Sequence, residues 1–294
     1  MAGYGGLPFA SIENDFLRLD YLTTTGPRIV GLYVSGVEGN LLASTPKVHW
    51  ETPHGEYYLR GGHRLGTAPE DPFYTCPEDG LDVIEVDNGI VLKSPVDVPR
   101  LQKEIEIQLD KNCVYLIHRV QWHGKQSIEF APWAITQLRL GSLAILPLSN
   151  ADGLQPDRNF VLWPYSKLQD ARLELFDDMI LLHGRASTQA LKIGNKNTNG
   201  WLACALGDAL FVKRFSANVD GRYPDLNSNV EAYVKDVCVE LETLGPLATL
   251  QRGETVTHEE TWQVFAGDYP PTLDGARKIK KQMLRSIMNG EKNG

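Results

Sequence analysis

The sequence predicts an all-β fold of antiparallel strands that ends in one helix. Three observations predict it. Segments in which apolar and polar residues alternate recur in pairs along most of the chain. Turn residues such as Asp87-Asn88-Gly89 separate the members of these pairs, as they do in β-hairpins. Spacing typical of an amphipathic helix occurs near the C-terminus, outside the paired segments.

The first predicted hairpin joins residues 15–21 to residues 28–34 through a turn at 23–27. Two further hairpins and a series of single strands follow, most of them bounded by turn residues. The hairpins pair residues 83–85 with 90–93 and residues 102–109 with 114–122. The later strands span residues 127–138, 144–147, 173–176, 179–183, 191–193, 200–206, 209–215, 237–244 and 255–265.

Two long stretches, residues 52–80 and 220–236, interrupt this rhythm. Both are rich in glycine, proline, aromatic and charged residues, and we expect them to be irregular. Long ordered loops often carry binding or catalytic groups, so these stretches are candidates for the functional site. The alternative is that they only cap the ends of the β structure.

Residues 272–288 predict the helix, because apolar residues recur there every three or four positions opposite a face rich in lysine and arginine. These apolar residues are Leu273, Ala276, Ile279, Met283 and Ile287. Such a basic helix can bind membranes, but its short apolar stripe favours a solvated face. No repeat or flexible linker marks a boundary, so we expect one β domain over residues 1–268 with a helical tail over 269–294.

The composition excludes several functional classes. A formal net charge of −8 and a pI near 5.4 argue against nucleic acid, which requires a basic face. The N-terminal sequence lacks the features of a signal peptide, and no later stretch is long enough to span a bilayer, so we expect a cytoplasmic protein without a membrane partner. The four cysteines are widely spaced and are interpreted as reduced. Neither they nor the histidines have metal-ligand spacing, so no cofactor is predicted.

Three segments carry a resemblance to known proteins: residues 26–32 with 39–42, Arg60-Gly61-Gly62-His63-Arg64-Leu65, and Glu240-Leu241-Glu242-Thr243 followed by residues 250–254. The first resembles the opening hairpin of the galactose mutarotase-like superfamily. The second is similar to the arginine-bearing loop of aldose 1-epimerases, and the third resembles the strand and turn that carry the general base of those enzymes. The resemblance implies an antiparallel β-supersandwich with a sugar in a cleft on one concave sheet.

A closer resemblance lies in residues 62–70, 131–136, 163–166, 192–194 and 223–225. These segments resemble one uncharacterised branch of this superfamily, the DUF4380 family. They occur in the same order in both, and the likeness extends over roughly residues 15–265.

Mutarotation requires a base for the anomeric hydroxyl and an acid for the ring oxygen. The resemblance implies Glu242 as the base, whereas Glu240, two residues away on the same strand face, is a salt-bridged residue or a second cleft residue. Trp133 stands where aldose 1-epimerases have their acid histidine, and the second family histidine has no counterpart between residues 70 and 86. His63 is the best substitute acid, with a structural role as the alternative.

A set of aromatic and polar residues accompanies these groups. Its aromatic rings can stack on a sugar or pack in the core, and its polar groups can bind hydroxyls. We expect substrate binding by Trp133, Trp163, Trp201, Tyr223, Arg64, Lys192, Asn195, Glu231 and Glu240. The oxygen-rich run from Asp225 to Glu231 can hold calcium, although a capped loop is the preferred interpretation.

Two functions therefore remain open from the sequence. The first is a carbohydrate-binding protein without the standard epimerase activity, and the second is an active sugar isomerase that uses Glu242 with His63. A purely structural role of the sheet face is a third, weaker interpretation. The expected partner is a small-molecule carbohydrate, for which Arg64, His63 and Lys192 would accept an anionic group. The oligomeric state stays open.

Overall fold

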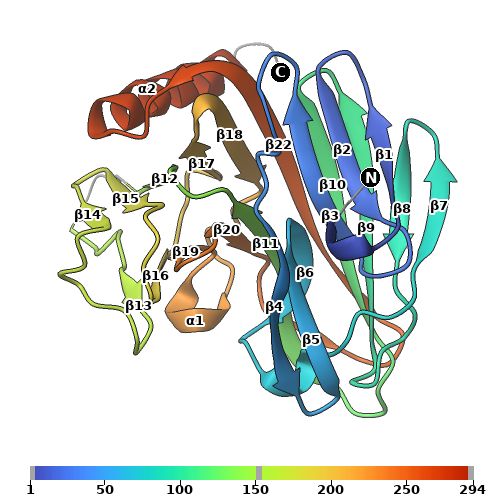
Figure 1. Cartoon of the computed structure of the whole chain (residues 1–294). Coiled ribbons are helices and arrows are strands. Elements are labelled where there is room, and N and C mark those ends of the chain that lie inside the picture. Colours follow the sequence, from blue (N-terminus) through green and yellow to red (C-terminus); the bar gives the residue numbers. More distant parts are fainter. Residues whose placement is uncertain (1–3, 150–153, 291–294) are drawn as a thin grey trace.

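The computed structural model describes residues 4–149 and 154–290. Within these residues, two ten-stranded antiparallel sheets pack against each other, as the sequence predicted (Figure 1). The first sheet has the order β1 (Phe9–Glu13), β2 (Leu17–Leu22), β3 (Arg28–Val34), β6 (His63–Ala68), β11 (Ile128–Leu138), β20 (Val239–Leu244), β19 (Val230–Val234), β16 (Leu191–Asn195) and β13 (Val161–Leu162), with β21 (Ala248–Leu250) paired to β11.

The second sheet runs across the other side of the core. Its order is β14 (Leu173–Leu175), β15 (Met179–His183), β12 (Leu143–Pro147), β17 (Trp201–Ala205), β18 (Gly207–Phe215), β22 (Thr255–Tyr269), β10 (Cys113–Trp122), β9 (Leu101–Asp110), β8 (Gly89–Lys93) and β7 (Asp82–Val86). A separate hairpin, β4 (Ser44–Thr52) with β5 (Gly55–Gly61), lies beside the first sheet (Figure 1).

The core lies between the two sheets and follows from the alternation along each strand. Leu19, Leu32 and Leu241 contribute to it from the first sheet, and Leu116 and Phe211 contribute from the second. Each is buried, while their sequence neighbours point to the opposite face of the sheet. The four cysteines carry free thiols.

The expectation that residues 52–80 and 220–236 are irregular was wrong in part. The first stretch contains β5 and β6, and the second contains β19 and the short helix α1 (Pro224–Asn227). The reason lies at Arg60, Gly61 and Gly62, whose φ angles of 60°, 89° and 73° turn the chain sharply between β5 and β6. A Cβ at Gly62 would lie 1.9 Å from the carbonyl oxygen of Ile29, so glycine is required there.

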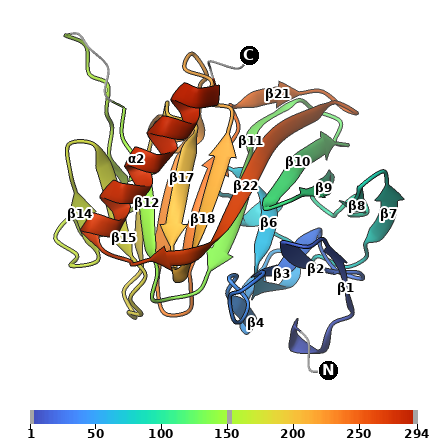
Figure 2. The same ribbon diagram turned by 90° about the horizontal axis from the view of Figure 1, so that it is seen from above.

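Helix α2 (Leu273–Gly290) crosses the outer face of the second sheet (Figure 2). Ala276, Ile279 and Met283 are buried against a cluster that includes Ile145 and Trp201, whereas the side chain of Ile287 lies outside the described part. No helix among the described residues is both long and apolar enough to cross a bilayer. The division of the chain at residue 268 and the cytoplasmic location stay predictions.

We expect the packing of α2 to contribute measurably to stability. Ile279→Ala should lower the free energy of unfolding by about 2–5 kcal/mol, because it opens a cavity beneath the helix. The matched control is Leu284→Ala, since Leu284 lies on the same helix and is 43% exposed. It should change stability by about 0.5 kcal/mol or less. Urea denaturation of the three proteins measures both effects, and equal losses would show that α2 does not pack as described.

Candidate functional site

The first sheet gathers the predicted polar residues on its outer face, which points away from the second sheet. Residues that pair directly across neighbouring antiparallel strands share a face. Ile135 pairs with both Arg64 and Glu242, and Glu242 also pairs with Glu231. Two residues from Glu242 and on the same face of β20, Glu240 pairs with Tyr233, which in turn pairs with Lys192 of β16. Strand register therefore brings together residues that are far apart in sequence.

Lys192 lies at the centre of this group. Its Nζ atom is 2.6 Å from Glu231 Oε2 and 2.9 Å from Glu242 Oε2. The same ammonium lies 4.6 Å from the ring centroid of Trp133 and 4.5 Å from that of Trp163, so both tryptophans make cation–π contacts with it. Trp133 also donates from Nε1 to Glu242 Oε2 over 2.6 Å.

Burial and charge shift the pKa values of Glu231 and Glu242 in opposite directions. Burial raises the pKa of Glu231 well above its usual range, and the attraction of Lys192 offsets this only in part. Burial also acts on Glu242, but Lys192 outweighs it and holds the pKa of Glu242 below its ordinary value. Lys192 therefore stabilises the ionised form of Glu242, and its ammonium contacts Glu231 as well.

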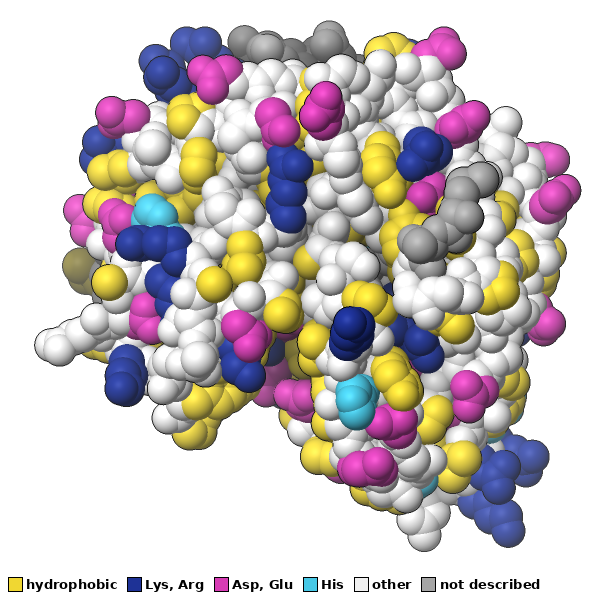
Figure 3. Space-filling view, viewed as in Figure 1, with side chains coloured by type: hydrophobic (Ala, Val, Ile, Leu, Met, Phe, Trp, Pro, Cys, Tyr) yellow, Lys and Arg dark blue, Asp and Glu magenta, His cyan; other side chains and the backbone are white. Residues whose placement is uncertain are grey.

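A cavity of about 440 Å³ opens beside this ion pair, within the size range of small-molecule sites. The hairpin β4–β5 and the first sheet provide its walls, and Figure 3 shows the hollow between that hairpin and the region around β13 and β16. Side chains of three kinds line it: aromatic, cationic and acidic. Among them are Trp50, Trp133, Tyr165, Tyr233, Arg64, Lys192, Glu70 and Glu240.

Glu240 is the acidic residue at the floor of the cavity. One of its oxygens accepts a hydrogen bond from Gln137 Nε2 over 2.6 Å. Burial, with repulsion from Glu242, raises the pKa of Glu240 to about 7 against the opposing attraction of Arg64 and Lys192. Glu240 therefore exchanges a proton near neutral pH while it faces the cavity.

Arg64 connects the sheet to the hairpin. Its Nη1 atom donates to the Tyr57 hydroxyl of β5 over 3.0 Å, and Arg28 Nη2 donates to the same oxygen over 3.0 Å. Arg28 also forms an ion pair with Glu78 at 2.6 Å. Two arginines of the sheet thus hold one tyrosine of the hairpin, which fixes the wall of the cavity against its floor.

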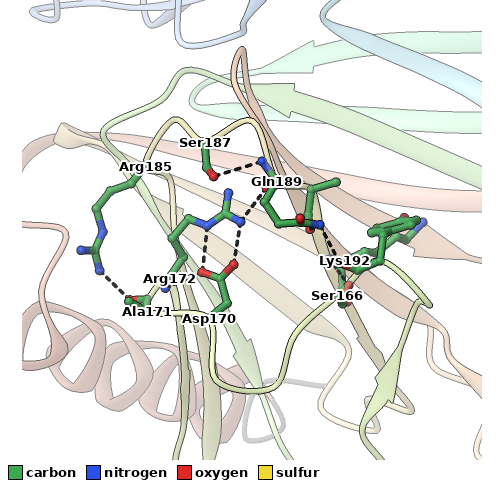
Figure 4. A network of polar contacts seen from close by, with 10 residues as sticks. Ser166, Asp170, Ala171, Arg172, Arg185, Ser187, Gln189 and Lys192 are labelled. Atoms are coloured by element: carbon green, nitrogen blue, oxygen red, sulfur yellow. Dashed lines mark hydrogen bonds and ion pairs between the residues drawn. The ribbon is translucent and has the colours of Figure 1, made fainter.

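The segment that carries Tyr165 is held by a polar network (Figure 4). The Ser166 hydroxyl donates to the backbone oxygen of Lys192 and accepts from its backbone N–H, both over 2.8 Å. Gln189 Nε2 donates to the backbone oxygen of Tyr165 over 2.8 Å, and the Gln189 carbonyl accepts from Arg172 over 2.7 Å. These bonds place the Tyr165 ring at the cavity, where it meets Tyr233 edge to face.

His63 does not lie in the cavity, which removes the support for His63 as the proton donor. It is adjacent to Arg64 in β6, so its side chain points to the other face, into the core between the sheets. There it is fully buried, with Nδ1 2.8 Å from the Thr136 hydroxyl and Nε2 2.8 Å from Nε2 of His118. Burial, with repulsion from His118, lowers the pKa of His63 well below its usual range.

The surroundings of His63 form a buried hydrogen-bond network. His118 Nδ1 lies 3.0 Å from the carbonyl oxygen of His258, so Nδ1 must carry the proton and Nε2 accepts from His63. Glu260 completes the network, held by Lys213 at 2.9 Å and by Trp262 Nε1 at 3.0 Å.

This network also brings metal-ligand atoms together. Ligand atoms of His63, His118 and Glu260 lie within 4.8 Å of one another, a spacing that a metal site can use. Hydrogen bonds already join the two facing Nε2 atoms and engage both oxygens of Glu260. The contacts therefore describe a hydrogen-bond network that connects the two sheets.

Three other predicted binding residues also lie away from the cavity. Trp201 is buried beneath α2 on the outer face of the second sheet. Asn195 is three positions from Lys192 in β16, so it points to the opposite face of the strand, where its side chain is buried. The Tyr223 hydroxyl bonds to the backbone of Asn218 within its own loop. Trp201 and Asn195 are therefore buried in the protein, and Tyr223 stabilises its own loop.

The run from Asp225 to Glu231, the candidate calcium loop, contains hydrogen bonds typical of a capped turn. Asn227 Oδ1 accepts from the backbone N–H of Tyr223 over 3.0 Å, and the Ser228 hydroxyl donates to the Asp225 carbonyl over 2.9 Å. Asp225 lies near Glu231, and burial raises the pKa of Asp225. The bonds of Asn227 and Ser228 thus stabilise the turn that directly precedes β19.

Among the residues that line or support the cavity and that sequence reasoning missed are Trp50, Gln137, Tyr165 and Tyr233. Tyr233 and Gln137 pair with Glu240 in β19 and β11, so correct strand register would have found them. Trp50 lies in the β4–β5 hairpin and Tyr165 lies in the loop after β13. In neither segment does an alternation of apolar and polar residues indicate which way the side chain points.

Comparisons with solved structures identify the fold. The structure is similar to the Slr1438 protein from Synechocystis sp. PCC 6803, with 12% identity, a TM-score of 0.57 and coverage of 89% of this chain and 96% of the other. It is similar to a proposed aldose 1-epimerase from Escherichia coli K12, with 12% identity, a TM-score of 0.54 and coverage of 89% and 100%. A galactose mutarotase-like protein from Lactobacillus casei ATCC 334 gives 10% identity, a TM-score of 0.54 and coverage of 88% and 100%.

These likenesses show a galactose mutarotase-like β-sandwich. Neither a family model nor a curated protein matches the sequence. At 10–12% identity the solved structures support the fold, and the residues of this chain must carry any argument about its ligand or chemistry.

We expect the Lys192 charge to hold the site together. Lys192→Met should lower the free energy of unfolding by about 3–5 kcal/mol at pH 7, because it leaves Glu242 as a buried unpaired carboxylate. Burial then raises the pKa of Glu242 in the variant, so the loss should shrink as the pH falls from 7 to 5 and the carboxylate is protonated. Lys281→Met on the exposed face of α2 is the matched control, and a loss for Lys192→Met no larger than the control's would contradict the ion pair.

The buried histidines predict a second pH dependence. Burial lowers the pKa of His258 to about 3, and the pKa values of His63 and His118 are lowered too, so the unfolded chain binds more protons below about pH 6.5. Stability should therefore fall between pH 6.5 and 5, by about 1.4 kcal/mol per pH unit for each histidine. His118→Gln should remove one histidine's share of that slope. Equal slopes in wild type and His118→Gln would contradict neutral buried histidines.

Proposed function

We propose that the protein binds a small-molecule carbohydrate in the cavity beside Lys192. The observation that carries this proposal is the lining, which combines aromatic faces with charged hydrogen-bonding groups. Trp133, Tyr165 and Tyr233 offer rings to the apolar face of a sugar, and Arg64 and Glu240 offer partners to its hydroxyls. The mutarotase-like fold supports the same ligand class.

The cavity is preferred over a second one of about 270 Å³ near Cys76, Asp97 and Lys103. Among the described residues that line this second cavity there is no tryptophan, tyrosine or phenylalanine. Its one ring for stacking is the imidazole of His54, so it offers hydrogen bonds but little of the flat aromatic surface that the larger cavity provides.

An isomerase that uses Glu242 with His63 finds less support. Glu242 is sealed beneath Lys192 and Trp133, and His63 lies on the other face of the sheet. The expected preference for an anionic sugar also weakens in part, because the Lys192 charge is already paired with Glu242, which leaves Arg64 and Lys235 as cations of a cavity that Glu70, Asp236 and Glu240 also line. We infer a sugar-binding protein of the DUF4380 type, a relationship that rests on the sequence motifs.

A panel of sugars tests the proposal. Neutral monosaccharides should raise the melting temperature, because a ligand that binds the native state alone stabilises it. Tyr165→Ala should weaken binding of the best ligand by about 3–10-fold in calorimetry, the usual value of an aromatic contact. Tyr115→Ala, at a residue of the second sheet that is 42% exposed, is the matched control.

Two results would contradict the assignment. If no sugar of the panel shifts the melting temperature, carbohydrate binding is wrong. If a sugar binds and Tyr165→Ala has no more effect than Tyr115→Ala, the sugar occupies another site.

A further inference from the structure

We propose that one exposed face of helix α2 docks the protein on an anionic lipid surface. This basic face consists of Arg277, Lys278, Lys281 and Arg285, and all four side chains are exposed. The proposal is independent of the sugar ligand, because α2 covers the second sheet and the cavity opens on the outer face of the first.

The helix presents its apolar and basic residues in opposite directions. Ala276, Ile279 and Met283 are buried against the second sheet. At 3.6 residues per turn, the four residues of the basic face fall within an arc of about 100° on the other side of the helix. Figure 3 shows basic side chains at the upper left, where α2 lies in Figure 1. A flat surface that approaches α2 from outside can therefore reach all four charges at once.

Neighbouring acids do not neutralise the basic face. The only acidic residue of α2 is Asp274, which lies 3.7 Å from Arg277 in an exposed ion pair. Such exposed pairs contribute little to stability. Within the described part of the chain, no carboxylate forms an ion pair with Lys278, Lys281 or Arg285. These three charges are thus available to a partner.

Lys280 has a different role from the basic face. It is half-buried, and its Nζ atom donates to Asp178 Oδ2 over 2.7 Å and to the Asp178 carbonyl over 3.1 Å. These bonds, together with the apolar contacts, fix α2 on the sheet. The helix therefore stays in place while its outer side contacts a partner.

The rest of the chain has the opposite charge. Helix α2 contains five cations and one acid, a net charge of +4, whereas the whole chain carries −8, so the remaining residues carry −12. An anionic surface attracts α2 and repels the remainder, which orients the molecule as it approaches. In this orientation the cavity faces away from the surface and stays accessible to its ligand.

The shape and composition of the basic face favour lipid over other anions. Sites for small molecules are concave, whereas this face is the convex side of a helix, and neither cavity described above includes a residue of α2. Leu284 lies next to Arg285 and is 43% exposed. Its side chain can enter the boundary between headgroups and acyl chains, whereas the phosphate backbone of a nucleic acid offers it no apolar contact.

This inference departs from the sequence-based expectation of no membrane partner. That expectation rested on the short apolar stripe of the helix and on the lack of a spanning segment. The structure uses the stripe to pack α2 on the second sheet. The membrane contact is therefore electrostatic and requires no insertion of the helix.

Flotation with lipid vesicles tests the proposal. In 50 mM NaCl, vesicles of phosphatidylcholine with 30% phosphatidylserine should bind wild type about tenfold or more above vesicles of phosphatidylcholine alone, because anionic lipid attracts the basic face. In 500 mM NaCl the difference should disappear, since salt screens charges over a shorter distance. Equal binding to the two vesicles in 50 mM NaCl would overturn the proposal.

Charge reversal locates the contact. A triple variant with Lys278→Glu, Lys281→Glu and Arg285→Glu should lower binding to the anionic vesicles about tenfold or more.

The matched control is a triple variant with Lys111→Glu, Lys125→Glu and Arg252→Glu, three exposed residues outside α2. It changes the net charge by the same amount and should stay within about threefold of wild type. Equal losses in the two triple variants would show that only net charge matters and would overturn docking through α2. If the variant of the basic face does not fold, the vesicle and salt comparisons on wild type still decide.

Leu284→Ser distinguishes lipid from a general polyanion. It should weaken binding to the anionic vesicles about 2–5-fold, because it removes the apolar contact. It should leave binding of a single-stranded DNA 20-mer unchanged, since that contact is electrostatic. If wild type binds the DNA as tightly as the vesicles and Leu284→Ser weakens neither, the basic face is a general polyanion site and lipid docking is wrong.

Discussion

The candidate site depends on one buried charge. The ammonium of Lys192 lies between two carboxyls and two tryptophan rings and contacts all four groups. Without the ammonium, Glu242 would carry its charge in a place that water does not reach. With the ammonium in place, Lys192, Glu242 and Trp133 are joined by an ion pair and a hydrogen bond. Lys192 and Trp133 of this group line the cavity.

Strand register explains why a charge can be placed there. The residues that meet at Lys192 come from β11, β16, β19 and β20, and pairing across these strands fixes which of them share a face. A slip of one residue in any pairing would turn charged groups into the core. The network of His63, His118 and Glu260 lies on the opposite face of the first sheet and also requires this register, because its bonds cross from one sheet to the other. Polar groups on both faces thus specify one register.

The sequence predicted the fold well because alternation and turn chemistry are local properties. The hairpins β2–β3, β7–β8 and β9–β10 all follow from such patterns. Strand β6 was missed because Gly61 and Gly62 read as a loop, although they form the sharp turn into the strand.

The site was harder to predict, since it depends on which face of a strand each residue occupies. Motif similarity named Arg64, Lys192 and Glu240, which line the cavity, and also His63 and Asn195, which point to the opposite face. Strand alternation separates adjacent residues such as His63 and Arg64, but it cannot say which face binds a ligand. Tyr165 lies in a loop placed by distant hydrogen bonds, so no local pattern could indicate it.

The hairpin β4–β5 pairs with neither large sheet, yet it supplies one wall of the cavity and is tied to the floor through the Tyr57 hydroxyl. Floor and wall therefore belong to separate sheets that meet at one phenol. Substitutions in the hairpin that keep Tyr57 can change the shape of the cavity while the strand pairing that holds the Lys192–Glu242 ion pair stays the same.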